Sequence, residues 1–403
     1  MKTDAYRVGA ATRDLTPDLR ETVYLAGFAP NRTAQEIIHP LEVSALYVDD
    51  GEKVICFVTL DLIGLLQPDL ERIRDRVAHL LPRESVIPCC THTHSGPDTL
   101  GLWGRTALGI PVQSGVDECY LEQVIATAAA TIEAAIYAAQ TSTLHSFNFT
   151  SPPHWVRNER KGGGDFNRVS GLLVRRNQEP YAVLLNFAAH PEALWEKNRG
   201  ISPDYPAPFR TQMKALGIPF PLFFSGPIGA MLTPDVNLDA GQNERVKYIE
   251  FFGRMLARET FRILPGARQI SGPLAVREEA VTLINANPRY SLARRLGFIR
   301  RPMTRSRIET RVATGCIGPL WFTTVPGEPS PEVGHEIAAL LGGKDNLILA
   351  LGLDELGYII PTDFFRNQEY RYEQTMSVGA HLVPLLLATI SRLKEKVEDD
   401  LRR

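Results

Sequence analysis

Apolar runs bounded by turn residues alternate with amphipathic stretches along the chain. The runs over 54–62 and 85–90 are rich in apolar and β-branched residues, and each predicts a buried strand. Between them, apolar residues recur at helical spacing after Pro68, which predicts a helix that Pro82 closes. Because such unbroken apolar runs are typical of strands covered on both faces, we expect helices to pack against the sheet.

The same patterns predict the remaining elements. Strands that alternate with helices indicate an α/β protein with a mixed β-sheet core flanked by helices. A Gly-rich stretch at 161–165 and an Arg-rich stretch at 294–307 are expected to be loops inside one domain that spans 1–403. The other predicted elements are helices over 117–140, 243–264 and 375–397, a hairpin that joins 173–175 to 182–189, and short strands over 320–325 and 346–351.

The composition is that of an ordinary globular protein. Of the 403 residues, 44% are hydrophobic and 22% are charged, which excludes a disordered chain, a collagen-like fibre and a coiled coil. A formal net charge of −2 gives no overall reason to bind nucleic acid or an anionic membrane. No signal-like segment and no run of about 18 apolar residues occurs, so we expect a cytoplasmic protein without a stable membrane anchor. Five cysteines without a C-x-x-C motif fit a reducing compartment, and Cys89 and Cys90 are expected to be small buried residues.

The sharpest local signal is THTHSGP at 91–97, directly after the predicted strand over 85–90. Side chains two apart in an extended chain point the same way, so His92 and His94 can face one site. Two imidazoles at this spacing can bind a metal, or one can bind it while the other acts beside it. Equally, both can be hydrogen-bonded residues of a polar loop. The motif alone leaves these interpretations open.

Three further residues follow strand ends. His190 ends the apolar run over 182–189, much as His92 follows its own strand, and ligands of α/β proteins bind beyond the carboxyl ends of strands. Glu328 lies in a tight turn, and Tyr358 follows the last short strand. Singly, these three read as a structural histidine, a solvated carboxylate and a core aromatic. Together with the two histidines they form an N/O ligand set suited to Zn²⁺.

The sequence resembles the N-terminal catalytic domain of the neutral/alkaline (non-lysosomal) ceramidase family. The most specific combination is THTHSGP at 91–97 with NFAAHP at 186–191 and ISPDYP at 201–206. The resemblance implies the family's catalytic domain without its C-terminal β-sandwich domain. It also implies a Zn²⁺-dependent hydrolase that cleaves the amide bond of an N-acyl substrate through a metal-activated water. The other matching stretches are VGAATRDLTPD at 8–18, AGF at 26–28, HPL at 39–41, PGE at 326–328, and Gly357-Tyr358 followed by Gln374.

The resemblance also implies roles for single residues. His94 would be the acid/base histidine that passes a proton to the leaving amine. Zn²⁺, Tyr358 or an arginine would stabilise the oxyanion. That arginine is expected from VRNER at 156–160, as Arg160 with Arg157 as the alternative. The expected partner is a small-molecule N-acyl amide, ceramide-like or other, and a homo-oligomer is possible. The implied zinc ligands are His92, His190, Glu328 and Tyr358.

Some positions depart from the family pattern. Thr233 stands where the family has a serine, and Met231 replaces an acid. The Gly-rich continuation after 91–97 is replaced by Asp98-Thr99-Leu100. The substrate therefore need not be ceramide. The same site could act on esters or lactones, and a non-catalytic binding protein that kept the fold is the other alternative. The complete ligand set argues against that last alternative.

Three features have two interpretations each. The arginines around 294–307 could attract an anionic substrate or a membrane surface, or lie in a solvated loop or subunit contact, which the near-neutral charge favours. His39 could support the site from outside the ligand set, or stabilise a turn. The stretch over 161–165 could be a mobile lid or a plain surface loop. The arginines are Arg294, Arg295, Arg300, Arg301, Arg305 and Arg307.

Overall fold

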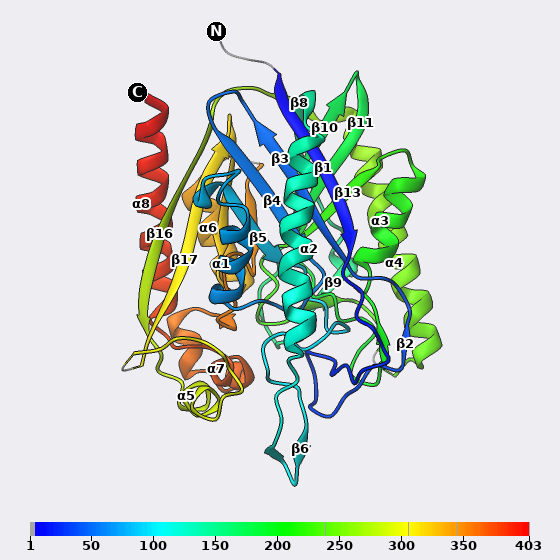
Figure 1. Cartoon of the computed structure of the whole chain (residues 1–403), viewed down its shortest axis with the longest axis vertical. Coiled ribbons are helices and arrows are strands. Elements are labelled where there is room, and N and C mark those ends of the chain that lie inside the picture. The colour runs from blue at the N-terminus through cyan, green and yellow to red at the C-terminus, as the bar shows by residue number, and fades with distance from the viewer. Residues whose placement is uncertain (1–4, 238, 305, 344, 403) are drawn as a thin grey trace.

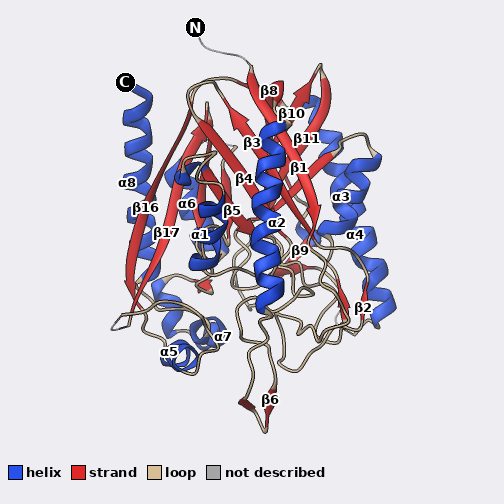
Figure 2. Ribbon diagram, viewed as in Figure 1, coloured by secondary structure: helices blue, strands red, loops and turns tan. Residues whose placement is uncertain are grey.

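The computed structural model describes residues 5–237, 239–304, 306–343 and 345–402. Two large sheets turn their inner faces to one shared apolar core, and helices cover the outer faces (Figures 1 and 2). Parallel and antiparallel strand pairs both occur. The predicted α/β class, a mixed sheet core flanked by helices, is therefore confirmed.

Within the part of the chain that the structure describes, the larger sheet has nine strands. They are β1 (Tyr6–Asp14), β3 (Glu42–Asp49), β4 (Val54–Leu60), β5 (Val86–Cys90), β8 (Gln140–Thr150), β10 (Arg168–Arg176), β11 (Glu179–Phe187), β13 (Phe220–Ser225) and β15 (Arg268–Ile270). Their order is β13-β11-β10-β8-β1-β3-β4-β5, with β15 also paired to β8. Only the start of β1 pairs with β8, so this short contact joins the two halves of the sheet. The apolar inner faces of both halves belong to the shared core.

The second sheet has four strands in the order β16 (Leu274–Ile284), β17 (Arg307–Ile317), β18 (Leu320–Val325) and β20 (Leu347–Ala350). Four pairs of very short strands brace the loops. They are β2 (Glu36–Ile37) with β12 (Gly200–Ile201), β6 (Thr106–Ala107) with β7 (Ile110–Pro111), β9 (Val156–Asn158) with β14 (Leu232–Pro234), and β19 (Glu328–Pro329) with β21 (Tyr358–Ile359).

Among the described residues, six helices cover the outer faces of the sheets. On the larger sheet, α1 (Gln67–Arg76) and α2 (Glu118–Tyr137) pack on one half, and α3 (Pro206–Ala215) and α4 (Gln242–Ile263) on the other. On the smaller sheet lie α6 (Pro331–Leu341) and α8 (Leu382–Arg402). Two further helices, α5 (Pro288–Arg295) and α7 (Arg371–Thr375), lie at the end of the molecule from which β6 and β7 project (Figure 1). Among the described residues, α2 is the helix long and apolar enough to cross a membrane by composition, and its buried side chains pack into the protein core.

Most predicted elements are found close to their expected bounds. The strands over 54–62, 85–90 and 320–325 correspond to β4, β5 and β18, and the predicted hairpin is β10 with β11. The predicted helices over 117–140 and 243–264 are α2 and α4. The predicted closing helix over 375–397 is wrong at its start, because α8 begins only at Leu382. Before it, Gly379 has a φ of 141°, and Asn287 Nδ2 donates to the carbonyls of Thr375 and Ser377, which holds that segment out of a helix.

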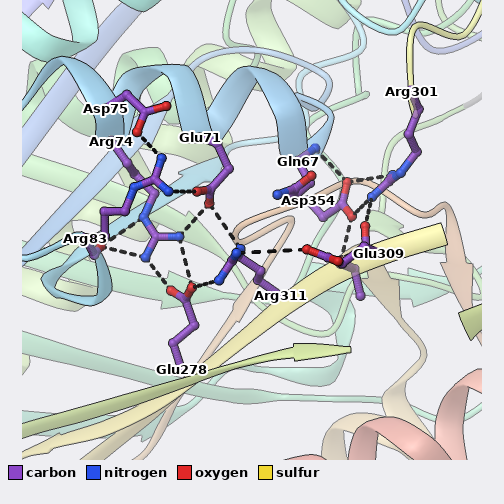
Figure 3. A network of polar contacts seen from close by, with 11 residues as sticks. Gln67, Glu71, Arg74, Asp75, Arg83, Glu278, Arg301, Glu309, Arg311 and Asp354 are labelled. Atoms are coloured by element: carbon purple, nitrogen blue, oxygen red, sulfur yellow. Dashed lines mark hydrogen bonds and ion pairs between the residues drawn. The ribbon is translucent and has the colours of Figure 1, made fainter. Parts of the chain in front are cut away.

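The stretch over 294–307, predicted to be a loop, belongs in part to a helix and a strand. Arg294 and Arg295 end α5, and Arg307 begins β17. Arg301 is buried and forms an ion pair with Asp354, whereas Arg300 pairs with Glu118 at the surface. Arg305 lies outside the described residues. The buried pair lies beside a second network, in which Arg74 of α1 binds Glu278 of β16 and Arg311 of β17 binds the same carboxylate (Figure 3).

Gly253 of α4 is expected to tolerate no larger side chain. A Cβ at this position would lie 2.4 Å from the backbone oxygen of Tyr205, at the contact between α3 and α4. We expect Gly253→Ala to lower the free energy of unfolding by about 1–2 kcal/mol, because overpacking against a fixed backbone atom outweighs the helix propensity gained. Urea unfolding measures this change. The exposed Arg258→Ala on the same helix serves as control, and a Gly253→Ala protein as stable as wild type would contradict the expectation.

Candidate metal and hydrolytic site

The ends of β5, β11 and β13 meet on one side of the core. Ser225, the last residue of β13, donates a hydrogen bond of 2.7 Å to the carbonyl of Thr91, directly after β5. The backbone N of His94 donates to the carbonyl of Pro191 at 3.1 Å, which brings the turn that follows β11 close to the THTH segment. His92 has a left-handed backbone, with a φ of 69°, so the chain turns sharply at this point. His92 and His94 are both buried and both reach the same cavity.

Three histidines from these strand ends form one cluster. One ring nitrogen from each of His92, His94 and His190 lies within 4.8 Å of the others, and all three side chains are buried. The structure thus brings together the histidines that the sequence singled out on two separate strands. Polar groups are not buried in this way without partners or a ligand.

Glu328 and Tyr358 join the cluster through the short pair β19–β21. The two residues are direct partners in this parallel pair, so the register places them side by side. Glu328 Oε2 lies 2.9 Å from His190 Nε2 and 3.3 Å from His92 Nε2. Tyr358 lines the same cavity, and its hydroxyl donates to the sulfur of Met231 at 3.0 Å.

Backbone carbonyls fix the Nδ1 atoms of the His92 and His190 rings. His92 Nδ1 donates to the carbonyl of Ile63 at 2.6 Å, and His190 Nδ1 donates to that of Leu232 at 2.8 Å. A carbonyl only accepts, so in both rings Nδ1 carries the proton, and Nε2 faces Glu328. Backbone carbonyls commonly orient metal-binding histidines in this way.

His94 has different surroundings. Its Nδ1 lies 3.2 Å from Glu192 Oε2, and neither ring nitrogen has a hydrogen-bond partner among the described residues. Burial lowers the pKa of His94 well below its usual value, and the neighbouring rings of His92 and His190 add to this effect. Burial also opposes protonation of His190, but the carboxylates of Glu192 and Glu328 outweigh it and raise its pKa to about 9.

The donor set suits a metal ion. The Nε2 atoms of His92 and His190 converge on a Glu328 carboxylate whose pKa falls to about 2, because the two rings outweigh the effect of its burial. A cation would sit between these atoms. There its positive charge, in place of that of the ring protons, would compensate the charge of the carboxylate. Imidazole nitrogen with carboxylate oxygen is a ligand set typical of Zn²⁺. The residues present therefore fit a metal ion.

A cavity of about 200 Å³ leads away from the cluster. His92, His94, Glu328 and Tyr358 lie at its polar end, and Tyr372 also lines it. The rest of the wall is mostly apolar. Its apolar side chains are Ile63, Leu66, Leu100, Leu102, Trp103, Ala293, Ile299, Leu356 and Met376, and the polar side chains of Asn287, Arg289, Tyr290, Glu355 and Thr375 also line it. A wall of this kind suits the hydrocarbon part of a substrate whose polar group reaches the cluster.

Of the two candidate arginines, Arg160 lies nearer the cavity wall. Its Nε donates to the buried carboxylate of Glu373 at 2.5 Å, and its guanidinium carbon lies 6.0 Å from the ring centre of Tyr372. Arg157 instead binds Glu159 at 2.7 Å and Asp235 at 3.0 Å. Tyr372 lines the cavity, whereas nothing links Arg157 to it among the described contacts.

Sequence reasoning missed two buried acids of the site. Glu192 is fully buried beside His94, and the signal for it was its position two residues after His190. Glu355 lines the cavity; its Oε1 accepts from Gly357 N at 2.7 Å, while its Oε2 has no partner among the described residues. Burial raises the pKa values of both carboxyl groups, and Glu328 adds to the shift of each.

The other candidate residues lie outside the cluster. His39 binds Ser202 at 3.0 Å and Glu250 at 2.9 Å, so it braces the segment before α3. Thr233 is buried in β14, next to the carbonyl that orients His190. The Gly-rich stretch over 161–165 is held by Glu332, which accepts from Gly164 N at 2.9 Å, and it does not line the cavity. As expected, Cys89 and Cys90 are buried.

No family model matches the chain. Two solved structures share its fold. The crystal structure of neutral ceramidase from Pseudomonas aeruginosa matches with a TM-score of 0.78 and 17% identity, over 98% of this chain and 75% of that chain. A ceramidase complexed with C2 matches with a TM-score of 0.80 and 15% identity, over 99% of this chain and 76% of that chain. The chain therefore has the neutral ceramidase fold, as its sequence motifs implied.

Proposed function

We propose, on the fold shared with the neutral ceramidases, that this protein is a zinc-dependent hydrolase of an N-acyl amide. The observation that carries the proposal is the buried cluster of three histidines with Glu328 at the polar end of an apolar cavity. A binding protein has no need of converging imidazoles and a carboxylate at the base of a cavity. In an amide with a hydrocarbon acyl group, the amide would lie at the polar end of the cavity and the acyl chain along its apolar wall.

His92, His190, Glu328 and Tyr358 would hold the zinc ion. The protonated Nδ1 of each of the two histidines bonds to a backbone carbonyl, which leaves Nε2 as the ligand atom. When bound, Zn²⁺ acts as a Lewis acid and lowers the pKa of water from 15.7 to about 7. The hydroxyl of Tyr358 would exchange its contact with the Met231 sulfur for this role.

His94 would serve as the acid/base. His94 lines the cavity and its Nε2 has no partner among the described residues, so this atom would be free to take a proton from the attacking water. The same atom would then give that proton to the leaving amine. Glu192, 3.2 Å from Nδ1, would orient the ring and stabilise its protonated form. This use of a buried acid behind a histidine resembles that of a hydrolytic triad.

Arg160 would stabilise the oxyanion with Tyr372 and Tyr358 around it. Glu373 holds the guanidinium by one nitrogen, which leaves its other donors for a substrate oxygen. The apolar wall would bind the acyl chain and exclude water from the reaction. Matched amide and ester substrates with the same acyl group will separate an amidase from an esterase acting at the same site.

Metal content is the test of this proposal. The purified protein is expected to hold about one zinc per chain by elemental analysis. In His190→Ala the zinc is expected to be lost together with amide hydrolysis, because the variant lacks one ligand and the hydrogen bond to a backbone carbonyl that orients it. The matched control is His39→Ala, since His39 lies outside the cluster and, among the described residues, bonds to Ser202 and Glu250. A wild-type protein that stays metal-free after zinc is added would overturn the proposal.

A further inference from the structure

The β6–β7 hairpin projects from one end of the molecule (Figure 1). Its tip is apolar. Leu108 is fully exposed, and Ile110 and Val112 are exposed to 64% and 52%. Three aliphatic side chains that are mostly exposed to water on so short a hairpin add little to the core, so they contribute little to the stability of the fold.

The backbone of the tip does not favour a leucine. Leu108 has a φ of 51° and Gly109 a φ of 76°, so both turn residues lie in the left-handed region. A hairpin turn of this kind is best served by Asn-Gly, and a bulky side chain at φ > 0 is unfavourable. A strained residue that makes no internal contact is a sign of a function outside the fold.

A second apolar surface lies beside the hairpin. Leu292 and Leu296, on and just after α5, are each 56% exposed. The base of the hairpin packs on the loop after α5, since a Cβ at Gly101 would lie only 2.0 Å from the carbonyl oxygen of Phe298. Both segments also form the wall of the active-site cavity, through Leu100 and Trp103 on one side and Ala293 and Ile299 on the other.

The charge of these two segments is one-sided. The sequence over 99–116 contains Arg105 and no acidic residue, and that over 286–302 contains five arginines and no acidic residue. Of these arginines, Arg301 is buried with Asp354 and Arg300 pairs with Glu118, so the positive charge of the two segments comes from Arg105, Arg289, Arg294 and Arg295. Arg105, Arg289 and Arg295 are exposed, and no ion pair holds them among the described residues. Aliphatic side chains surrounded by arginines are typical of surfaces that bind anionic bilayers.

We propose that the hairpin tip over 105–112 and the exposed face of α5 form a docking surface for an anionic lipid bilayer. Leu108 and Ile110 would enter the acyl boundary, while the arginines contact lipid phosphates. The bilayer would then lie against the end of the molecule whose segments form the cavity wall. A substrate with a hydrocarbon chain could reach the cavity from the membrane. The docking itself does not depend on the proposed hydrolase activity.

Vesicle co-sedimentation without substrate tests this surface. Wild-type protein is expected to bind vesicles of phosphatidylcholine with phosphatidylglycerol at least tenfold more tightly than phosphatidylcholine alone, with the difference falling at high salt. Leu108→Asn with Ile110→Thr is expected to weaken binding to the anionic vesicles at least tenfold. The same double variant is expected to fold at least as stably as wild type, since asparagine suits the left-handed turn. Arg105→Gln with Arg295→Gln is expected to remove the preference for anionic lipid, and neither residue lines the cavity.

Phe251→Asn is the matched control, because Phe251 is 64% exposed on α4. Equal binding of wild type and the hairpin variant to anionic vesicles would overturn the proposal, as would no binding of wild type. A concentration-dependent dimer in gel filtration that the hairpin variant abolishes would instead assign the surface to a second copy of this chain. Zinc content and hydrolysis of a soluble amide are expected to be unchanged in these variants, so failure of docking and failure of the hydrolase proposal are distinguishable.

Discussion

His94→Gln is expected to lower kcat on a soluble N-acyl amide by about 10²–10⁴ while leaving the zinc content at its wild-type value. Glutamine fills a similar volume but cannot take and return a proton. The hydrogen bonds from Nδ1 of His92 and of His190 to backbone carbonyls do not involve His94, so these two rings keep their orientation in the variant. Single-turnover rates and elemental analysis of the same sample measure both effects.

The alternative ligand set gives the opposite result. His94 lies close enough to His92 and His190 to bind the metal with them. In that case His94→Gln would lose zinc as His190→Ala does, and Glu328 would be the acid/base in its place. The variant Glu192→Gln further distinguishes a catalytic His94 from a metal-binding His94. If Glu192 orients a catalytic His94, the variant keeps its zinc, loses about 10–100-fold in kcat and shifts the pH profile.

The histidine pattern was readable from the sequence because it follows two strong apolar strands. The runs that became β5 and β11 end where a ligand-binding loop must begin, and both carry a histidine at that point. The partners of those histidines were not readable. His92 and His190 are oriented by the carbonyls of Ile63 and Leu232, and any residue type supplies a carbonyl. No side-chain pattern records such a contact.

Glu328 and Tyr358 show a second limit. The pairing of β19 with β21 involves two residues on each strand and sets the two side chains together. Strands this short have no period, so local pattern carries no information on their partner. Their positions after predicted strands suggested an N/O ligand set, and the family resemblance implied the same roles, but neither predicted that the two residues pair with each other. The hairpin of β16 and β17 escaped prediction for another reason: charged residues interrupt it on its exposed face, as in VREEAV of β16.

Arg301→Met is expected to lower the free energy of unfolding by about 3–5 kcal/mol, because it leaves the buried carboxylate of Asp354 without its cation. Asp354 is fully buried and also accepts from Gln67 N at 2.9 Å and Thr310 Oγ1 at 2.6 Å, so it joins the start of α1 to β17 (Figure 3). Urea unfolding with a constant m-value measures the loss.

The double variant Arg301→Met with Asp354→Asn shows how much of this loss in the free energy of unfolding comes from the unpaired charge of Asp354. Asparagine keeps an acceptor for Gln67 or Thr310 but carries no charge to bury. We therefore expect the double variant to be more stable than Arg301→Met alone, since the cost of an unpaired buried ion exceeds the net value of the pair. If the double variant is less stable than the single one, the bonds of Asp354 to α1 and β17 are the larger contribution.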